Sequence, residues 1–153
     1  NELGLIWEDS AAKDDIVVSS EMYIVKDEPV KLIIGSRDVV HDVGLPHFRL
    51  KMDAVPGIPT TMWFTPKYTT AEMKEITKNP DFEYELACDQ MCGNGHYSMK
   101  GIVKVVTKSE FILWRAQQQS QYSKIFTKPA TIVDTTKPNS TAAVEPKPIA
   151  PKP

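Results

Sequence analysis

The chain lacks several features that would place it in common classes of protein. It has no excess of positive charge, because 18 Lys and Arg stand against 20 Asp and Glu, for a formal net charge of −2. That balance argues against non-specific binding to nucleic acid, which needs a basic face. No apolar run approaches the ~20 residues of a membrane helix, and the N-terminus carries no signal pattern. The chain begins with Asn1 rather than Met, so we expect a processed or excised piece whose membrane anchor lies outside it.

Cysteine is scarce as well, and both cysteines fall in one short stretch. The segment "CDQMCGNGHYSM" at 88–99 holds them together with one of the three histidines and two of the six methionines. Within it, Cys92, His96 and Met99 have the spacing Cys-x3-His-x2-Met. Thiolate and thioether are soft donors that suit Cu(I), and imidazole binds either oxidation state of copper. The pattern is typical of a copper site for electron transfer.

Cys88 adds a second thiolate four residues before Cys92. A mononuclear copper site has no use for it, whereas two thiolates can bridge two copper ions, each completed by one imidazole and one weak ligand. Such a centre needs a second histidine from outside the loop, either His41 or His47.

Two other readings of the loop stay open on the residues alone. The cysteines could form a disulfide, although closing so small a loop stabilises little and leaves His96 and Met99 without a role. A Cys2His2 zinc site also fits the ligand count, with His41 or His47 as the fourth ligand, but methionine is not a usual zinc ligand.

The pattern of short β-rich runs predicts a mostly β domain over residues 1–127, a Greek-key sandwich or barrel. Two short helices are expected, at 69–80 and 107–122, because Thr69 and Thr107 each precede a Glu in capping-box register. The loop at 88–101 then joins two strands. The strands are expected at 15–18, 21–26, 30–34, 47–52, 60–65, 82–87 and 102–106.

The end of the chain has a different composition. Residues 128–153 contain half of the 12 prolines and no aromatic residue. Such a segment cannot bury enough apolar surface to offset its ordering entropy. We expect a disordered C-terminal tail.

Three stretches together resemble a known family. "DVVH" at 38–41, "KMDAVPG" at 51–57 and "CDQMCGNGHYSMKG" at 88–101 are similar, in this order, to subunit II of haem–copper cytochrome c oxidases. The resemblance runs from about residue 30 to 114. It implies a cupredoxin-like fold that carries a dinuclear copper centre, called CuA, with two copper ions. The ligand set it implies is His41, Cys88, Gln90 through its backbone carbonyl, Cys92, His96 and Met99.

The sequence departs from the family at several positions. The family commonly has Glu where Gln90 stands, and that Glu helps to hold a magnesium ion at the contact with the catalytic subunit. Gln90 keeps the carbonyl and removes the carboxylate, so the resemblance supports copper here but not magnesium. Ile58 replaces the usual Arg after "DAVPG". The helix at 69–80 lengthens the spacing from His41 to Cys88, and the family's N-terminal membrane hairpin and the electron-entry tryptophan that follows it have no counterpart.

The resemblance implies an electron-transfer subunit on the periplasmic face of a bacterial inner membrane. It would take electrons from a c-type cytochrome and pass them to haem in the catalytic subunit I, within a complex that contains further respiratory subunits. The domain alone would perform no bond chemistry. Two alternatives are the CuA domain of a nitrous-oxide reductase-like enzyme and a copper chaperone or store for oxidase assembly.

A docking site for the cytochrome is predicted beside the copper ligands. Asp42 and Asp89 are the acids nearest to the ligands in sequence, and complementary charge commonly steers such encounters. We expect a basic cytochrome to dock near them, with Lys100 at the edge of the contact.

Overall fold

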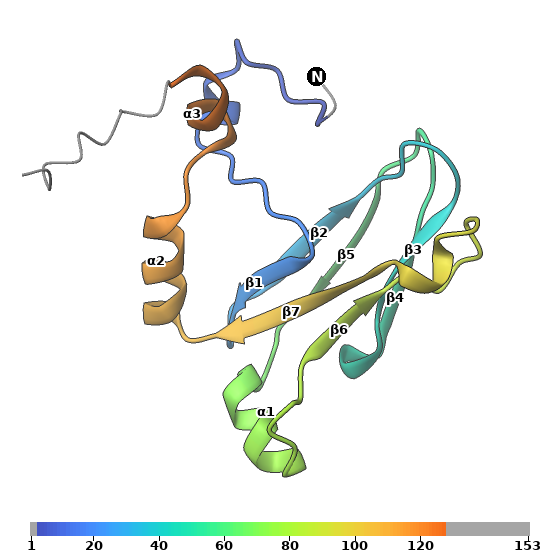
Figure 1. The fold of residues 1–153 in the computed structure, drawn as a ribbon, viewed down its shortest axis with the longest axis vertical. Coiled ribbons are helices and arrows are strands. Elements are labelled where there is room, and N and C mark those ends of the chain that lie inside the picture. The colour runs from blue at the N-terminus through green and yellow to red at the C-terminus, as the bar shows by residue number, and fades with distance from the viewer. Residues whose placement is uncertain (1–2, 128–153) are drawn as a thin grey trace, which may run out of the picture.

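The computed structural model describes residues 3–127, which form two packed β-sheets with helices at their margins (Figure 1). Five strands form one curled sheet in the order β1-β7-β6-β3-β4, and β2 pairs with β5 in a second sheet. Neighbouring strands are antiparallel except β1 and β7. The strands are β1 (Glu21–Val25), β2 (Val30–Ile34), β3 (His41–Leu45), β4 (Leu50–Ala54), β5 (Thr60–Phe64), β6 (Tyr84–Ala87) and β7 (Lys100–Val106). The tail expected at 128–153 lies outside the described residues.

The core lies between the two sheets and follows the alternation of each strand. Val103 and Val105 on β7 are almost completely buried, and they meet Leu45 of β3 and Phe64 of β5 in one apolar cluster. Because side chains two apart share a face of a strand, each sheet buries one face. The mostly β sandwich predicted from the sequence is confirmed.

The first expected helix is confirmed. α1 (Thr70–Thr77) begins with a complete capping box, in which Thr69 Oγ1 accepts the Glu72 N–H at 3.1 Å and Glu72 Oε2 accepts the Thr69 N–H at 2.7 Å. The helix ends at Lys78, which adopts a left-handed conformation with φ 54°. None of the helices in the described part of the chain is both long enough and apolar enough to cross a membrane.

The second expected helix, at 107–122, is two helices instead of one. α2 (Lys108–Gln117) begins with the predicted capping box at Thr107, but Gln118 is extended, with φ −83° and ψ 144°. Ser120 then caps α3 (Gln121–Phe126) by accepting the Ser123 N–H. The polar "QQQS" run contains no apolar residue to hold a continuous helix against the sheet.

Two expected strands also differ from the structure, and one observed strand was not expected. Residues 15–18 are not a strand, and β3 was not expected at all. The strand expected at 47–52 begins later, because Pro46 opens a 3-10 turn, η2 (Pro46–Phe48), and Arg49 reverses the chain in a left-handed conformation with φ 56°. Two further 3-10 turns are η1 (Ser10–Lys13) and η3 (His96–Ser98).

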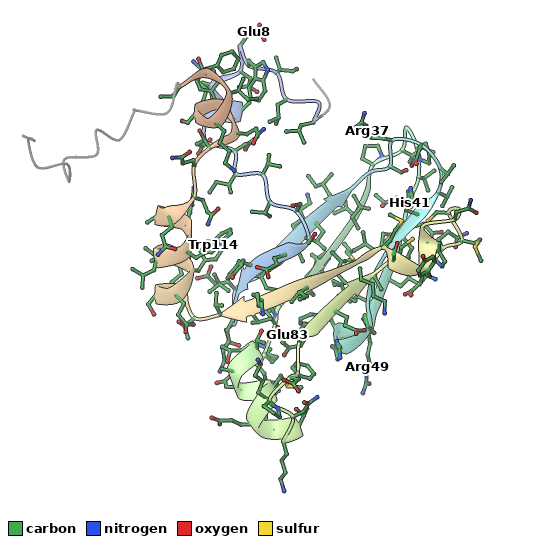
Figure 2. All side chains as sticks on the ribbon, in the orientation of Figure 1. Glu8, Arg37, His41, Arg49, Glu83 and Trp114 are labelled. Atoms are coloured by element: carbon green, nitrogen blue, oxygen red, sulfur yellow. The ribbon has the colours of Figure 1, made fainter. Side chains whose placement is uncertain are left out.

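The cysteine-rich segment joins β6 to β7, as predicted. Ala87, the last residue of β6, pairs with Lys100, the first residue of β7, so residues 88–99 form a loop at one end of the sheet. β7 runs from this loop to α2 at the opposite end (Figure 1). Figure 2 shows His41 beside the loop and Trp114 of α2 far from it.

Candidate metal centre

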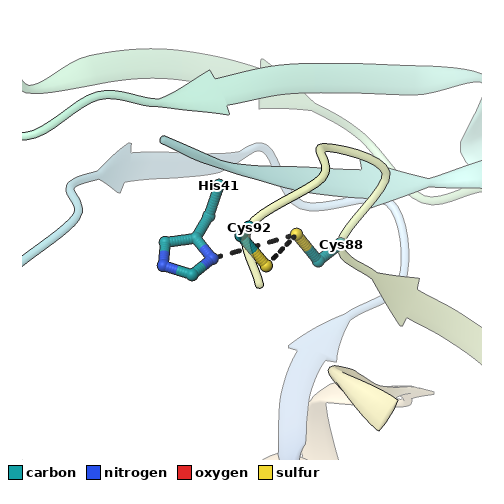
Figure 3. A group of neighbouring side chains, drawn as sticks. All are labelled: His41, Cys88 and Cys92. Atoms are coloured by element: carbon teal, nitrogen blue, oxygen red, sulfur yellow. Dashed lines mark hydrogen bonds between the residues drawn. The ribbon is translucent and has the colours of Figure 1, made fainter. Parts of the chain in front are cut away.

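Sheet pairing brings His41 to the two cysteines, although 47 residues separate it from Cys88. Gly44 of β3 pairs with Ala87 of β6, so the start of β3 lies beside the residue that follows β6. His41 Nδ1 is 4.0 Å from Cys88 Sγ, and Cys88 Sγ is 3.7 Å from Cys92 Sγ (Figure 3). The three donor atoms lie within 4.8 Å of one another, close enough to hold a metal ion.

The two cysteines are free thiols. Their 3.7 Å sulfur separation is far longer than a disulfide bond of about 2.05 Å. It also suits a shared ion, because two metal–thiolate bonds of about 2.3 Å can span that distance. The disulfide alternative therefore does not describe this structure.

The remaining predicted ligands surround the same two sulfur atoms. His96, at the start of η3, has its Nδ1 3.6 Å from Cys92 Sγ, and Met99 Sδ is 3.3 Å from that sulfur. The carbonyl oxygen of Gln90 is 3.3 Å from Cys88 Sγ. We call the six residues the ligand cluster: His41, Cys88, Gln90, Cys92, His96 and Met99.

A carboxylate that the sequence analysis gave no role orients His41. Asp38 lies three residues earlier, and its Oδ1 accepts the Nε2–H of His41 at 2.7 Å. This bond leaves the lone pair of Nδ1 directed at Cys88, which is how carboxylates commonly orient metal-binding histidines. The hydrogen bond to Asp38, and next the Cys88 sulfur, raise the pKa of His41. The hydrogen bond to His41 in turn lowers the pKa of Asp38. The signal was present in the sequence, as the first residue of "DVVH".

The thiol of Cys88 is poised to ionise near neutral pH. Burial opposes its ionisation, but backbone hydrogen bonds at Gln90 and Asp42 and the two facing imidazoles bring its pKa down to about 6. Burial and the neighbouring Cys88 sulfur raise the pKa of Cys92. Because the thiolate is the form that binds metals, Cys88 is the readier of the two thiols to bind a cation.

Gly44 lets the loop lie directly on β3. A Cβ atom at this position would be 2.2 Å from Asp89 Oδ2 and 3.1 Å from the Ala87 carbonyl oxygen. An alanine here would require the Asp89 side chain to turn and the Ala87 carbonyl to shift by a few tenths of an ångström. Sequence analysis missed this role, because nothing local to Gly44 shows what packs on it.

His47 lies outside the ligand cluster. It belongs to η2, beyond the end of β3 opposite to His41, and its Nδ1 accepts the Glu85 N–H at 3.2 Å. Its ring packs edge-on against Phe82 and Tyr84, with centroids 5.0 and 5.8 Å away. The second imidazole near the cysteines is therefore that of His41.

The residues predicted to dock a cytochrome have different surroundings. Asp42 is only 5% exposed, and its Oδ1 accepts the Asp89 N–H at 3.4 Å. Asp42 is therefore too buried to contact a partner directly, and docking of a cytochrome near Asp42 and Asp89 stays a prediction. Asp89 and Lys100 are exposed beside the loop.

Comparison with known proteins agrees with the geometry. The family model described as cytochrome c oxidase subunit II, periplasmic domain, matches residues 8–106. The alternative cytochrome c oxidase subunit 2 of Bradyrhizobium diazoefficiens is 33% identical over 121 residues, which cover 78% of this chain and 39% of that protein. Cytochrome c oxidase subunit 2 of Thermostichus vulcanus is 36% identical over 107 residues, covering 70% of this chain and 29% of that protein. The chain thus spans less than half the length of these relatives.

A solved structure has a related fold. The crystal structure of the periplasmic domain of subunit II of cytochrome oxidase from Bradyrhizobium japonicum aligns with a TM-score of 0.54 and 27% identity, over 66% of this chain and 64% of that one. Fold, family match and relatives agree: the chain belongs to the family of the periplasmic domain of cytochrome c oxidase subunit II.

Proposed function

We propose that this chain is the electron-transfer domain of a haem–copper oxidase, with two copper ions held by the ligand cluster. One observation carries the proposal: all six donor residues meet at two sulfur atoms that are 3.7 Å apart. Electrons would come from a c-type cytochrome and go to haem in the catalytic subunit. The match to oxidase subunit II favours this function over a nitrous-oxide reductase or a copper chaperone.

The donor set fits copper better than zinc. Two thiols and a thioether are soft donors, and each of the two imidazoles presents its Nδ1 atom to a different sulfur. Copper in such a set cycles between two oxidation states and so carries one electron at a time. Zinc has no redox chemistry and does not use the thioether that Met99 offers.

The protein's part is to hold these donors still. His41 is fixed by β3 and by the Asp38 carboxylate, while Cys88 is held by β6 and by its N–H bond to the Met99 carbonyl at 3.1 Å. Donor atoms fixed in this way keep their positions when the oxidation state of a bound metal changes. Because little rearrangement is then needed, electron transfer can be fast. Gln90 offers an amide and no carboxylate, so the proposal includes no magnesium at that residue.

The proposed setting is the periplasmic face of a bacterial inner membrane. The loop has an apolar rim there, because Met91 and Tyr97 are 80% and 81% exposed and Met99 is 42% exposed. An apolar rim around a metal allows a partner to approach closely with little desolvation of charge.

Copper quantification and electron paramagnetic resonance of the 153-residue chain test the proposal. Reconstitution should give two copper ions per chain, with one unpaired electron shared over both ions in the oxidised form. A limit of one copper with a mononuclear spectrum would refute the dinuclear centre. Rapid loss of copper to a weak chelator would favour the chaperone.

Docking of the cytochrome should depend on salt. With Asp42 buried, the proposal assigns the steering charge to Asp89, which is exposed next to Cys88. Exposed charges are screened beyond about 10 Å at 0.1 M salt. Asp89→Asn should therefore slow the bimolecular reduction of the copper-loaded chain by a basic cytochrome several-fold at low salt, and have little effect at high salt. Stopped-flow mixing measures both rates, with Asp81→Asn as an exposed control far from the loop, and equal rates for the two variants would place the docking site elsewhere.

A further inference from the structure

Three aspartates cross the sheet in a row on the side of β3 that faces away from His41. Successive side chains of a strand point to opposite faces, so Asp42 points away from the face that carries His41. On the adjacent strand β4, Asp53 is the direct partner of Asp42 in the antiparallel register. Directly opposed residues have side chains on the same face, so these two carboxylates are neighbours.

Asp89 continues the row on the other side of Asp42. Its N–H donates to Asp42 Oδ1 at 3.4 Å. Its own carboxylate lies over Gly44, two residues after Asp42 and therefore on the same face, where a Cβ would be 2.2 Å from Asp89 Oδ2. Asp53, Asp42 and Asp89 thus form what we call the aspartate row.

Asp42, the middle residue of the row, has one carboxylate oxygen without a hydrogen-bond partner among the described residues. The residue is 5% exposed, and this oxygen, Oδ2, is buried. A buried carboxylate oxygen without a partner is unfavourable, and like charges placed opposite each other on a sheet are destabilising.

Lys51, a basic residue on the same face, does not meet this need. Lys51 pairs with Gly44 and so shares the face of the row, and its charge acts to lower the pKa of Asp42. It is exposed, and in the described part of the chain it forms no ion pair with any of the three aspartates. Lys51 is therefore a competitor for the row and not its fixed partner.

We propose that the aspartate row binds a hard divalent cation, Ca²⁺ in the first place, with Asp42 as the central ligand. Calcium takes six to eight oxygen ligands in flexible geometry, and carboxylates with water satisfy it. The buried Oδ2 of Asp42 would supply the fixed contact, and the exposed carboxylates of Asp53 and Asp89 can turn to complete it. This site uses oxygen donors only, and Asp42 points to the opposite face of β3 from His41, so the two sites select different metals.

A cation here would fasten the start of the loop to the sheet. Asp89 follows Cys88 directly, while Asp42 follows His41, so one ion would link the two segments that supply the first pair of copper ligands. Binding to the folded chain only would also stabilise it by mass action. The site thus has two readouts that do not need oxidase activity: the heat of binding and the midpoint of thermal unfolding.

Calorimetric titration of the copper-loaded, chelator-washed 153-residue chain with CaCl₂, and separately with MgCl₂, tests the proposal. One Ca²⁺ should bind with a Kd of about 0.1–1 mM, the range of extracellular calcium modules, and should raise the unfolding midpoint. Asp53→Asn and Asp89→Asn should each weaken binding about tenfold or more, since each removes one carboxylate ligand. Asp81→Asn, an exposed acid after α1, is the matched control and should bind as the unaltered chain does.

Lys51→Gln separates a cation site from an internal ion pair. If the row binds calcium, loss of the competing ammonium should tighten binding several-fold and leave copper at two per chain. If Lys51 neutralises the row instead, the same variant should lower the unfolding midpoint and create no tighter site, which would overturn the proposal. Absence of binding by either cation at about 10 mM would also overturn it, as would Asp53→Asn and Asp89→Asn variants that bind like the control.

Discussion

Replacing either cysteine of the ligand cluster by serine should abolish the dinuclear copper centre. Cys88 Sγ lies 4.0 Å from His41 Nδ1 and 3.3 Å from the Gln90 carbonyl oxygen, and Cys92 Sγ lies 3.6 Å from His96 Nδ1 and 3.3 Å from Met99 Sδ. Each sulfur therefore gathers its own pair of donors, and removing one separates the two halves of the site. A serine hydroxyl is a hard donor that does not ionise near neutral pH, so it cannot take over this role.

Copper per chain and the paramagnetic resonance spectrum measure the effect. In the Cys88→Ser and Cys92→Ser variants, bound copper should fall from two ions per chain to one or none. The spectrum of a shared electron should be lost. His41→Ala should have nearly the same effect, whereas His47→Ala should keep both ions, because its ring packs on Phe82 and Tyr84. A serine variant that retained a shared-electron spectrum would contradict bridging by the thiolates, and reversed histidine results would contradict the choice of His41.

Much of the site could be predicted because its ligands are local in sequence. Cys88, Cys92, His96 and Met99 lie within twelve residues, so their spacing alone indicates a shared metal. His41 is different, because the residues left His47 equally open and the family resemblance decided between them. The contact that unites them depends on the pairing of Gly44 with Ala87, and pairing between distant strands is not written in either segment.

The burial of Asp42 was missed for a related reason. β3 reads "HDVGL", and its Asp and Gly residues are poor strand formers, so nothing local predicts a strand there. Without the strand, Asp42 looks like an exposed loop acid. Once β3 lies between β6 and β4, Asp42 is covered on both sides, and an acid expected on the surface becomes a buried one. The capping boxes at Thr69 and Thr107 were predictable because all their bonds lie within one turn.

Leu45→Ala should cause the largest loss of stability of any single change proposed for this chain. Leu45 is completely buried at the end of β3, one residue after Gly44, and it belongs to the core cluster formed by both sheets. Removing a buried leucine side chain loses its transfer free energy and leaves a cavity, which together lower the free energy of unfolding by about 2–5 kcal/mol. Denaturant unfolding of the copper-free chain measures this as a lower midpoint with an unchanged slope.

Leu113→Ala is the matched control, because that leucine on α2 is 65% exposed, and the change should stay within about 0.5 kcal/mol. The copper-loaded Leu45→Ala chain should still bind two copper ions in the absence of denaturant, since the change removes no donor. It should lose them at a lower denaturant concentration than the control, because β3 holds His41 in place only while the sheet is folded. Equal midpoints for the two leucine variants would mean that the end of β3 is not part of the core. The position of His41 would then not depend on the packing of β3.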